Sequence, residues 1–173
     1  SKEIGYYQFV QYIFFNQWFK LKKYANDKGI KIIGDMPFYV DHGSVEVWLD
    51  NKSFLLDGIG YPTSVAGVPP DYFSPTGQYW GNPIYDWQYL EKNDFRFWIE
   101  RIGWASEIFD ITRIDHFRAF DSYWDIPACA KTAMEGKWQY APGYALFDKI
   151  YETLGDVELV AEDLGYLRPE VIE

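Results

Sequence analysis

Three short apolar segments, each ending in acidic residues, constrain the fold of this chain more than any other feature of its sequence. They are Ile30–Asp35, Ile111–Asp115 and Val157–Asp163. Before each segment, apolar residues recur every three or four positions, which is the spacing of an amphipathic helix. The helices predicted from this spacing cover residues 8–28, 94–108 (with Asn93 as its N-cap) and 143–154. Strands that alternate with helices in this way form a parallel sheet, so we predict an α/β fold.

The links between the predicted helices and strands differ in length. Each strand follows its helix closely, whereas the segments after the first two strands are long and irregular. These segments, residues 36–92 and 117–141, combine aromatic residues with turn formers, and a short helix is predicted at 44–50. Parallel sheets, open or closed into a barrel, form their sites at the carboxyl ends of the strands. We therefore expect the acidic strand ends and the aromatic loops at one edge of the sheet.

The middle apolar segment carries the residues with the clearest chemical meaning. A strand's period of two places Arg113 and Asp115 on one face, roughly 6.5–7 Å apart along the backbone, and Ile114 and His116 on the other. A cation at that distance favours the ionised form of the carboxylate. An anionic Asp at a strand end is suited to act as a nucleophile or an electrostatic stabiliser. An ion pair that only closes the strand is the alternative.

Charge and residue usage exclude several classes of partner and cofactor. The net charge of -10 argues against binding to nucleic acid or to an anionic membrane, and it is compatible with a neutral sugar. Cys129 is the only cysteine, so the chain has no internal disulfide and no cysteine metal cluster. His42 and His116 have no partner at metal-ligand spacing, so we expect no catalytic metal. With no signal peptide or membrane-length apolar run in the sequence, we expect a cytoplasmic location.

Acidic strand ends beside an aromatic-rich pocket fit glycoside chemistry. Phe, Trp and Tyr make up 21% of the chain, and many of them fall in the long loops. Cleaving a glycosidic bond requires a carboxylic acid for the leaving oxygen, and a retaining enzyme adds a carboxylate nucleophile. Aromatic faces pack on the apolar faces of sugar rings. Aldolases and other barrel enzymes also place acids at strand ends, so this pattern alone is not specific.

Four motifs, in order along nearly the whole chain, resemble those of the 4-α-glucanotransferases (amylomaltases), which belong to the same clan as α-amylase. The motifs are Gly34–Phe38, Gly67–Phe73 continuing to Trp80–Pro83, Arg113–Arg118 and Ala161–Gly165. The resemblance implies a (β/α)8 barrel. A complete barrel typically needs about 250 residues, so we expect residues 1–173 to form a partial catalytic domain, cut at both ends, with about three of the strands.

The resemblance also implies roles for individual residues. Asp115 is the nucleophile, Arg113 keeps it ionised and oriented, and Glu162 rather than Asp163 is the general acid/base. The period of two along a strand cannot decide between Glu162 and Asp163, because strands that are buried on both faces do not alternate in polarity. The residues implied in substrate binding are Asp35, Tyr72, Phe73, Trp80 and His116. The implied reaction moves α-1,4-glucan segments between maltooligosaccharides with retention, without a metal or organic cofactor.

One departure from the family pattern affects what the chain can do alone. The family has a third carboxylate in a His-Asp-Asn motif, and no His-Asp pair occurs in this sequence. We therefore expect the isolated chain to be inactive or nearly so. Uncovered sheet edges and apolar helix faces also predict self-association. The alternatives are an α-amylase-type hydrolase and a non-catalytic glucan-binding module that uses Tyr72, Phe73 and Trp80.

Overall fold

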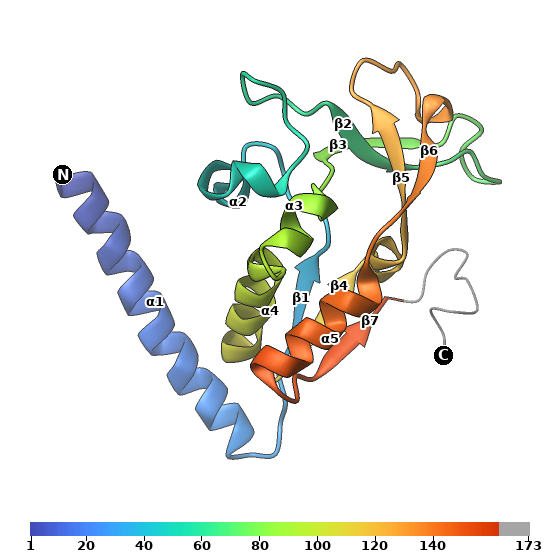
Figure 1. Ribbon diagram of the computed structural model, residues 1–173. Coiled ribbons are helices and arrows are strands. Elements are labelled where there is room, and N and C mark those ends of the chain that lie inside the picture. Colours follow the sequence, from blue (N-terminus) through green and yellow to red (C-terminus); the bar gives the residue numbers. More distant parts are fainter. Residues whose placement is uncertain (163–173) are drawn as a thin grey trace.

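The computed structural model describes residues 1–162, which form two sheets flanked by helices (Figure 1). Asp163 and the rest of the fourth motif's end lie outside these residues. The helices are α1 (Lys2–Asn26), α2 (Val45–Leu49), α3 (Trp87–Lys92), α4 (Arg96–Ile108) and α5 (Gly143–Leu154), with 3-10 helices η1 (Asn51–Ser53), η2 (Phe117–Phe120) and η3 (Ala133–Glu135). The strands are β1 (Ile33–Pro37), β2 (Ser64–Val68), β3 (Gln78–Pro83), β4 (Ile111–Asp115), β5 (Ser122–Pro127), β6 (Lys137–Tyr140) and β7 (Leu159–Ala161).

The predicted parallel sheet is confirmed: its three strands lie in the order β1-β4-β7. Its middle strand, β4, has the predicted bounds, whereas β1 begins three residues later than predicted. The backbone N–H of Ile32 donates to the carboxylate of Asp110 at 2.8 Å, so the chain joins the sheet only after this residue. β4 pairs with both neighbours in parallel, which brings the carboxyl ends of all three strands to one edge.

The two faces of the parallel sheet differ in burial. Thr112 and Ile114 of β4 are buried, whereas Arg113 and Asp115 on the opposite face are partly exposed. The expectation that the strands are buried on both faces is therefore wrong for the described residues. The face that carries Thr112 and Ile114 packs beside α4 and α5, which lie next to each other (Figure 1).

Aromatic rings fill much of the core beside this sheet. Trp98 of α4 is completely buried, and its ring lies 4.8 Å from that of Phe120 and 5.2 Å from that of Phe38. Tyr85 and Trp87 complete the cluster around it. Because Phe38 directly follows β1 and Phe120 lies just beyond β4, this packing fixes the chain at the point where both strands leave the sheet.

The two long segments predicted to be irregular contain most of a second, antiparallel sheet with the order β3-β2-β5-β6. Gly interrupts the alternation in β2 and β3, and β6 is only four residues long, so these strands were not predicted. A Cβ atom at Gly67 in β2 would lie 2.1 Å from the backbone oxygen of Gln78, so only glycine permits this approach of β3. The N-cap prediction for Asn93 was also wrong: it is the C-cap of the unpredicted α3, and Phe95 precedes α4.

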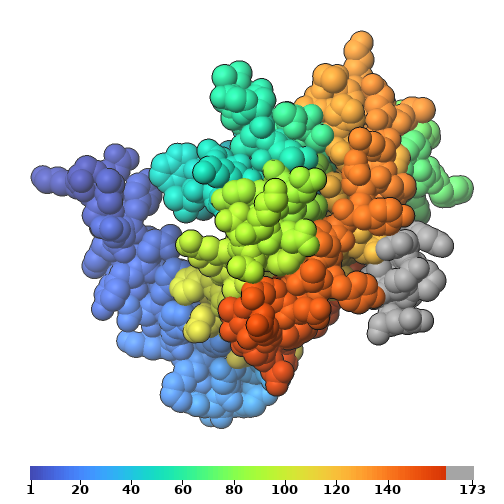
Figure 2. Space-filling view, in the orientation of Figure 1, coloured from blue at the N-terminus to red at the C-terminus, as the bar shows by residue number. Residues whose placement is uncertain are grey.

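The first helix extends away from the rest of the described chain (Figures 1 and 2). It spans Lys2–Asn26 rather than the predicted 8–28, and none of its residues is buried. Three side chains in its second half donate hydrogen bonds to residues 108–110: Trp18 to the carbonyl of Ile108 at 2.9 Å, Lys22 to that of Phe109 at 3.0 Å, and Asn26 to the carboxylate of Asp110 at 2.8 Å. Within residues 1–162, no helix has both the length and the apolar character needed to cross a bilayer.

Trp98 offers a direct test of how far the aromatic core stabilises the fold. Replacing Trp98 by Ala should lower the free energy of unfolding by about 3–5 kcal/mol, because it leaves a large cavity. Trp98→Phe should cost less, because the phenyl ring leaves a smaller cavity. Both variants remove an indole N–H that is buried without a partner among the described residues. Trp48→Ala is the matched control, because Trp48 is 78% exposed. Equal losses in urea denaturation for Trp98→Ala and Trp48→Ala would contradict this account.

Candidate active site

One arginine holds three carboxylates together at the carboxyl edge of the parallel sheet. The Nη1 of Arg113 donates to Asp35, and its Nη2 donates to Asp115 Oδ1 at 3.1 Å and to Glu162 Oε1 at 2.8 Å. The hydrogen bond with Asp35 is the main reason why the pKa of Arg113 is raised above its ordinary value. The guanidinium therefore stays charged and compensates part of the negative charge gathered around it.

The strand register produces this arrangement. Asp35 in β1 lies directly opposite Arg113 in β4, and both point to the face away from the helices. The backbone N–H of Glu162 donates to the carbonyl of Ile114 at 3.1 Å, so Glu162 continues the pairing just beyond β7. The residue before Asp35 must be glycine, because a Cβ atom at Gly34 would lie 2.0 Å from the ring of Phe109.

Glu162 is the most enclosed of the three carboxylates. Its side chain is 14% exposed, compared with 47% for Asp115. Its second oxygen, Oε2, accepts the backbone N–H of His116 at 2.6 Å. His116 has a left-handed backbone (φ 53°), and this turn directs its N–H back toward Glu162. Both oxygens of Glu162 therefore have a fixed donor.

The side chain of His116 is electrically neutral at physiological pH. Burial, with a smaller contribution from the nearby Arg118, lowers the pKa of His116 to about 4. Its ring lies 5.0 Å from that of Trp80, edge to face, and 5.8 Å from that of Tyr39. The ring is thus held between aromatic neighbours, and as a neutral imidazole it has one donor and one acceptor nitrogen.

Asp115 and Glu162 line a cavity of about 850 Å³, whose walls include residues from both sheets. Of the residues predicted as a site, Asp115, Glu162, His116, Phe73 and Trp80 line it. Asp35 meets the site through Arg113 instead. Tyr72 does not line the cavity: it is 96% exposed on the loop that the Asp71 carboxylate fixes by accepting the N–H groups of Phe73 and Ser74.

Several lining residues were absent from the prediction. They are Tyr39, Gln78, Asn82, Arg118 and Trp138, among others. Arg118 lies within the third motif and Asn82 within the second, so the resemblance contained a signal for both. Trp138 belongs to β6, which had no recognisable pattern. In residues 1–162, no three His, Cys, Asp or Glu side chains gather in a way that could hold a metal ion.

The chain resembles known proteins in sequence over all 173 residues and in structure over 96% of them. The sequence profile of the 4-alpha-glucanotransferase family matches residues 1–173. A 4-alpha-glucanotransferase of Thermus thermophilus is 54% identical over 171 residues, which are 99% of this chain and 34% of that protein.

Two solved structures of amylomaltases have the same arrangement of elements. The one from Streptococcus agalactiae, in complex with acarbose, is 51% identical with a TM-score of 0.93, and the match covers 96% of this chain and 34% of that one. The one from Corynebacterium glutamicum, 22% identical with a TM-score of 0.83 over 96% of this chain and 23% of that one, shares the fold. The chain spans about a third of the length of the curated relatives it matches. By its sequence profile over all 173 residues, the chain belongs to the 4-alpha-glucanotransferase family.

Proposed function

We propose that this chain carries the nucleophile and the acid/base of a retaining 4-α-glucanotransferase, which moves α-1,4-glucan segments between maltooligosaccharides. The observation that carries the proposal is the single nitrogen of Arg113 that donates to both Asp115 and Glu162 at the wall of an aromatic cavity. The amylomaltase of Streptococcus agalactiae, which shares this fold, was solved in complex with acarbose. A cytoplasmic location and self-association stay predictions from sequence.

In this proposal β1, β4 and β7 are three of the eight strands of a (β/α)8 barrel, and residues 1–173 are part of its catalytic domain. Two apolar side chains support it. Ile33 and Val160 are 61% and 44% exposed on the sheet face opposite the helices. In a barrel that face is the packed interior, where side chains of this kind dominate.

The separation of the two carboxylates supports retention of stereochemistry. The nearest oxygens of Asp115 and Glu162 accept bonds from one nitrogen, so they lie no more than about 6 Å apart. Retaining glycosidases keep their two carboxyl groups roughly 5–5.5 Å apart, whereas inverting enzymes need roughly 6.5–9.5 Å to admit a water.

The reaction then takes two steps. An oxygen of Asp115 attacks the anomeric carbon of the donor glucan, the glycosidic bond breaks, and Glu162 gives its proton to the leaving oxygen. The products are a glucosyl ester of Asp115 and a shorter glucan with a free 4-hydroxyl. In the second step Glu162 takes the proton of an acceptor's 4-hydroxyl, whose oxygen attacks the same carbon and releases Asp115. Phe73 and Trp80 at the cavity wall favour a sugar over water in that step.

The proposal requires Glu162 to change its contacts when substrate binds. Arg113 and the N–H of His116 occupy both oxygens of Glu162, yet in the first step one of these oxygens must carry a proton toward the leaving oxygen. We propose that the donor glucan displaces Arg113 from Glu162, so that Arg113 stays with Asp115, where an anion is needed. Glu162 then loses its cationic partner as the leaving oxygen arrives.

Asp115 should be the residue that a glucosyl donor labels covalently. An activated fluoroglucosyl fluoride loses fluoride without protonation, so it should add one glucosyl unit to Asp115. The test compares the chain with a chimera in which it replaces the matching third of the Thermus thermophilus relative. Intact mass and peptide mapping should locate the adduct, and Asp115→Asn should abolish it. If neither protein forms an adduct, the enzyme proposal is wrong.

Glu162→Gln should separate the two steps. With a maltosyl fluoride donor, the chimera should still form the ester at Asp115, whereas transfer to added maltose should slow by about 10²–10⁴-fold, because no base remains. Glu158→Gln is the matched control, since Glu158 is an exposed residue of the same segment and pairs with Lys31. Equal transfer rates in the two variants would contradict the role of Glu162. Transfer of the maltosyl group to water, which yields maltose, rather than to the added maltose would favour the hydrolase.

The chain by itself should be a poor catalyst. Because the sequence has no His-Asp pair and residues that act as a unit are not additive, transfer from maltotriose should be slower than in the chimera by about 10³-fold or more. Chromatography of the oligosaccharide products gives both rates. Equal turnover by the chain and the chimera would refute the need for a third carboxylate.

A further inference from the structure

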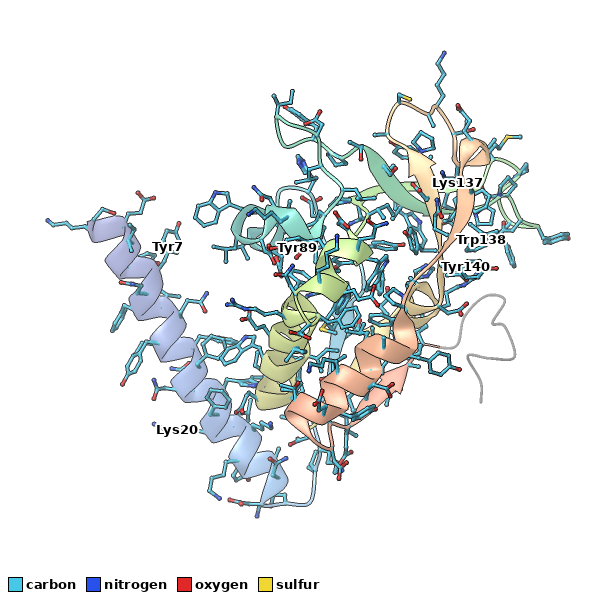
Figure 3. All side chains as sticks on the ribbon, viewed as in Figure 1. Tyr7, Lys20, Tyr89, Lys137, Trp138 and Tyr140 are labelled. Carbon is cyan, nitrogen blue, oxygen red and sulfur yellow. The ribbon has the colours of Figure 1, made fainter. Side chains whose placement is uncertain are left out.

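Trp138 stands at the wall of the active-site cavity although nothing in the proposed reaction uses it. It lies on β6, at the edge of the antiparallel sheet (Figure 3). It lines the same cavity as Asp115 and Glu162, and 42% of its surface is exposed. A tryptophan that served only the core would be buried, as Trp98 is.

Two neighbouring side chains, Arg118 and Trp124, hold the indole of Trp138 in place. The guanidinium of Arg118, in η2 directly after β4, lies 4.3 Å from the centre of its ring, within the range of a cation–π contact. Trp138 pairs with Trp124 of the neighbouring strand β5, and the centroids of the two rings lie 5.2 Å apart. Trp124 is itself fixed, because its indole N–H donates to the carbonyl of Ala133 at 2.8 Å.

A glycine next to β6 is part of this arrangement. A Cβ atom at Gly136 would lie 2.3 Å from the indole nitrogen of Trp124, so any other residue would push β6 away from it. The chain therefore holds Trp138 rigidly while leaving it partly exposed. A preorganised aromatic surface loses little side-chain entropy when a ligand binds to it.

Unpaired polar groups stand beside this aromatic surface. The hydroxyl of Tyr39 and the Nε of Arg118 are buried and have no hydrogen-bond partner among residues 1–162. Both side chains line the cavity. These two atoms are enclosed, so a ligand would contact the exposed part of the Trp138 indole rather than them, and the cavity of about 850 Å³ has room for more than one sugar ring.

We infer that Trp138 and Arg118 form a glucosyl-binding subsite apart from the bond that reacts. The indole packs on the apolar face of one ring of a longer glucan, and Arg118 holds the indole in position. The inference takes its ligand class from the proposed function. It makes Trp138 a residue that selects glucans by length, since a short donor that fills only the space beside Asp115 does not reach it.

Calorimetric titration of the 173-residue chain with maltoheptaose and with maltose tests this subsite. Trp138→Ala should weaken maltoheptaose binding by about three- to tenfold and leave maltose binding unchanged. Trp138→Phe, which keeps a smaller ring, should give an intermediate loss. Trp48→Ala removes a tryptophan that is 78% exposed and does not line the cavity, and it should change neither affinity.

Three results would overturn the inference: no binding of maltoheptaose by the unmodified chain, equal affinities for Trp138→Ala and Trp48→Ala, or equal losses for both sugars. If Trp138→Ala fails to fold by circular dichroism, Trp138→Phe decides in the same way. An adduct at Asp115 in the chimera, together with maltoheptaose binding that does not depend on Trp138, rejects the subsite alone. Binding that depends on Trp138 without any adduct in the chimera rejects the enzyme and leaves a glucan-binding module.

Discussion

The contact of one guanidinium with three carboxylates determines how this site is built. Asp35 in the middle of β1, Asp115 at the end of β4 and Glu162 just beyond β7 come from three different strands, and without Arg113 their negative charges would repel one another. A lysine could not replace Arg113, because only the planar fork of arginine directs several N–H groups to fixed points at once. Since Asp35 and Arg113 face each other across β1 and β4, a shift of one residue in their pairing would send one of them to the buried face.

The second sheet adds the walls that the parallel sheet lacks. From the end of β4 the chain runs through η2 straight into β5, so only a few residues separate the carboxylates from the antiparallel sheet. The cavity between them receives Trp80 from β3 and Trp138 from β6. A scaffold of strands places these rings more precisely than free loops would.

The sequence predicted the charged half of the site better than its aromatic half. Arg113 and Asp115 were found because an apolar strand has a period of two and ends in a charge, and the parallel sheet follows from its alternation with helices. Assigning Glu162 rather than Asp163 needed the family motif, since both follow the same strand. Trp138 could not be found, because β6 is four residues long and is defined by its pairing with β5, far from any local pattern. Exposure of Tyr72 likewise depends on how its loop folds back, which no spacing encodes.

The left-handed backbone at His116 separates two tasks that one residue performs. Its N–H holds Glu162 through the main chain, so that contact does not depend on which side chain occupies the position. Its imidazole, between Trp80 and Tyr39, faces the cavity independently. The side chain at this position can therefore be exchanged without displacement of Glu162, but only among residues that tolerate positive φ, chiefly Gly, Asn and Asp. The backbone thus limits which side chains can face the cavity at this point.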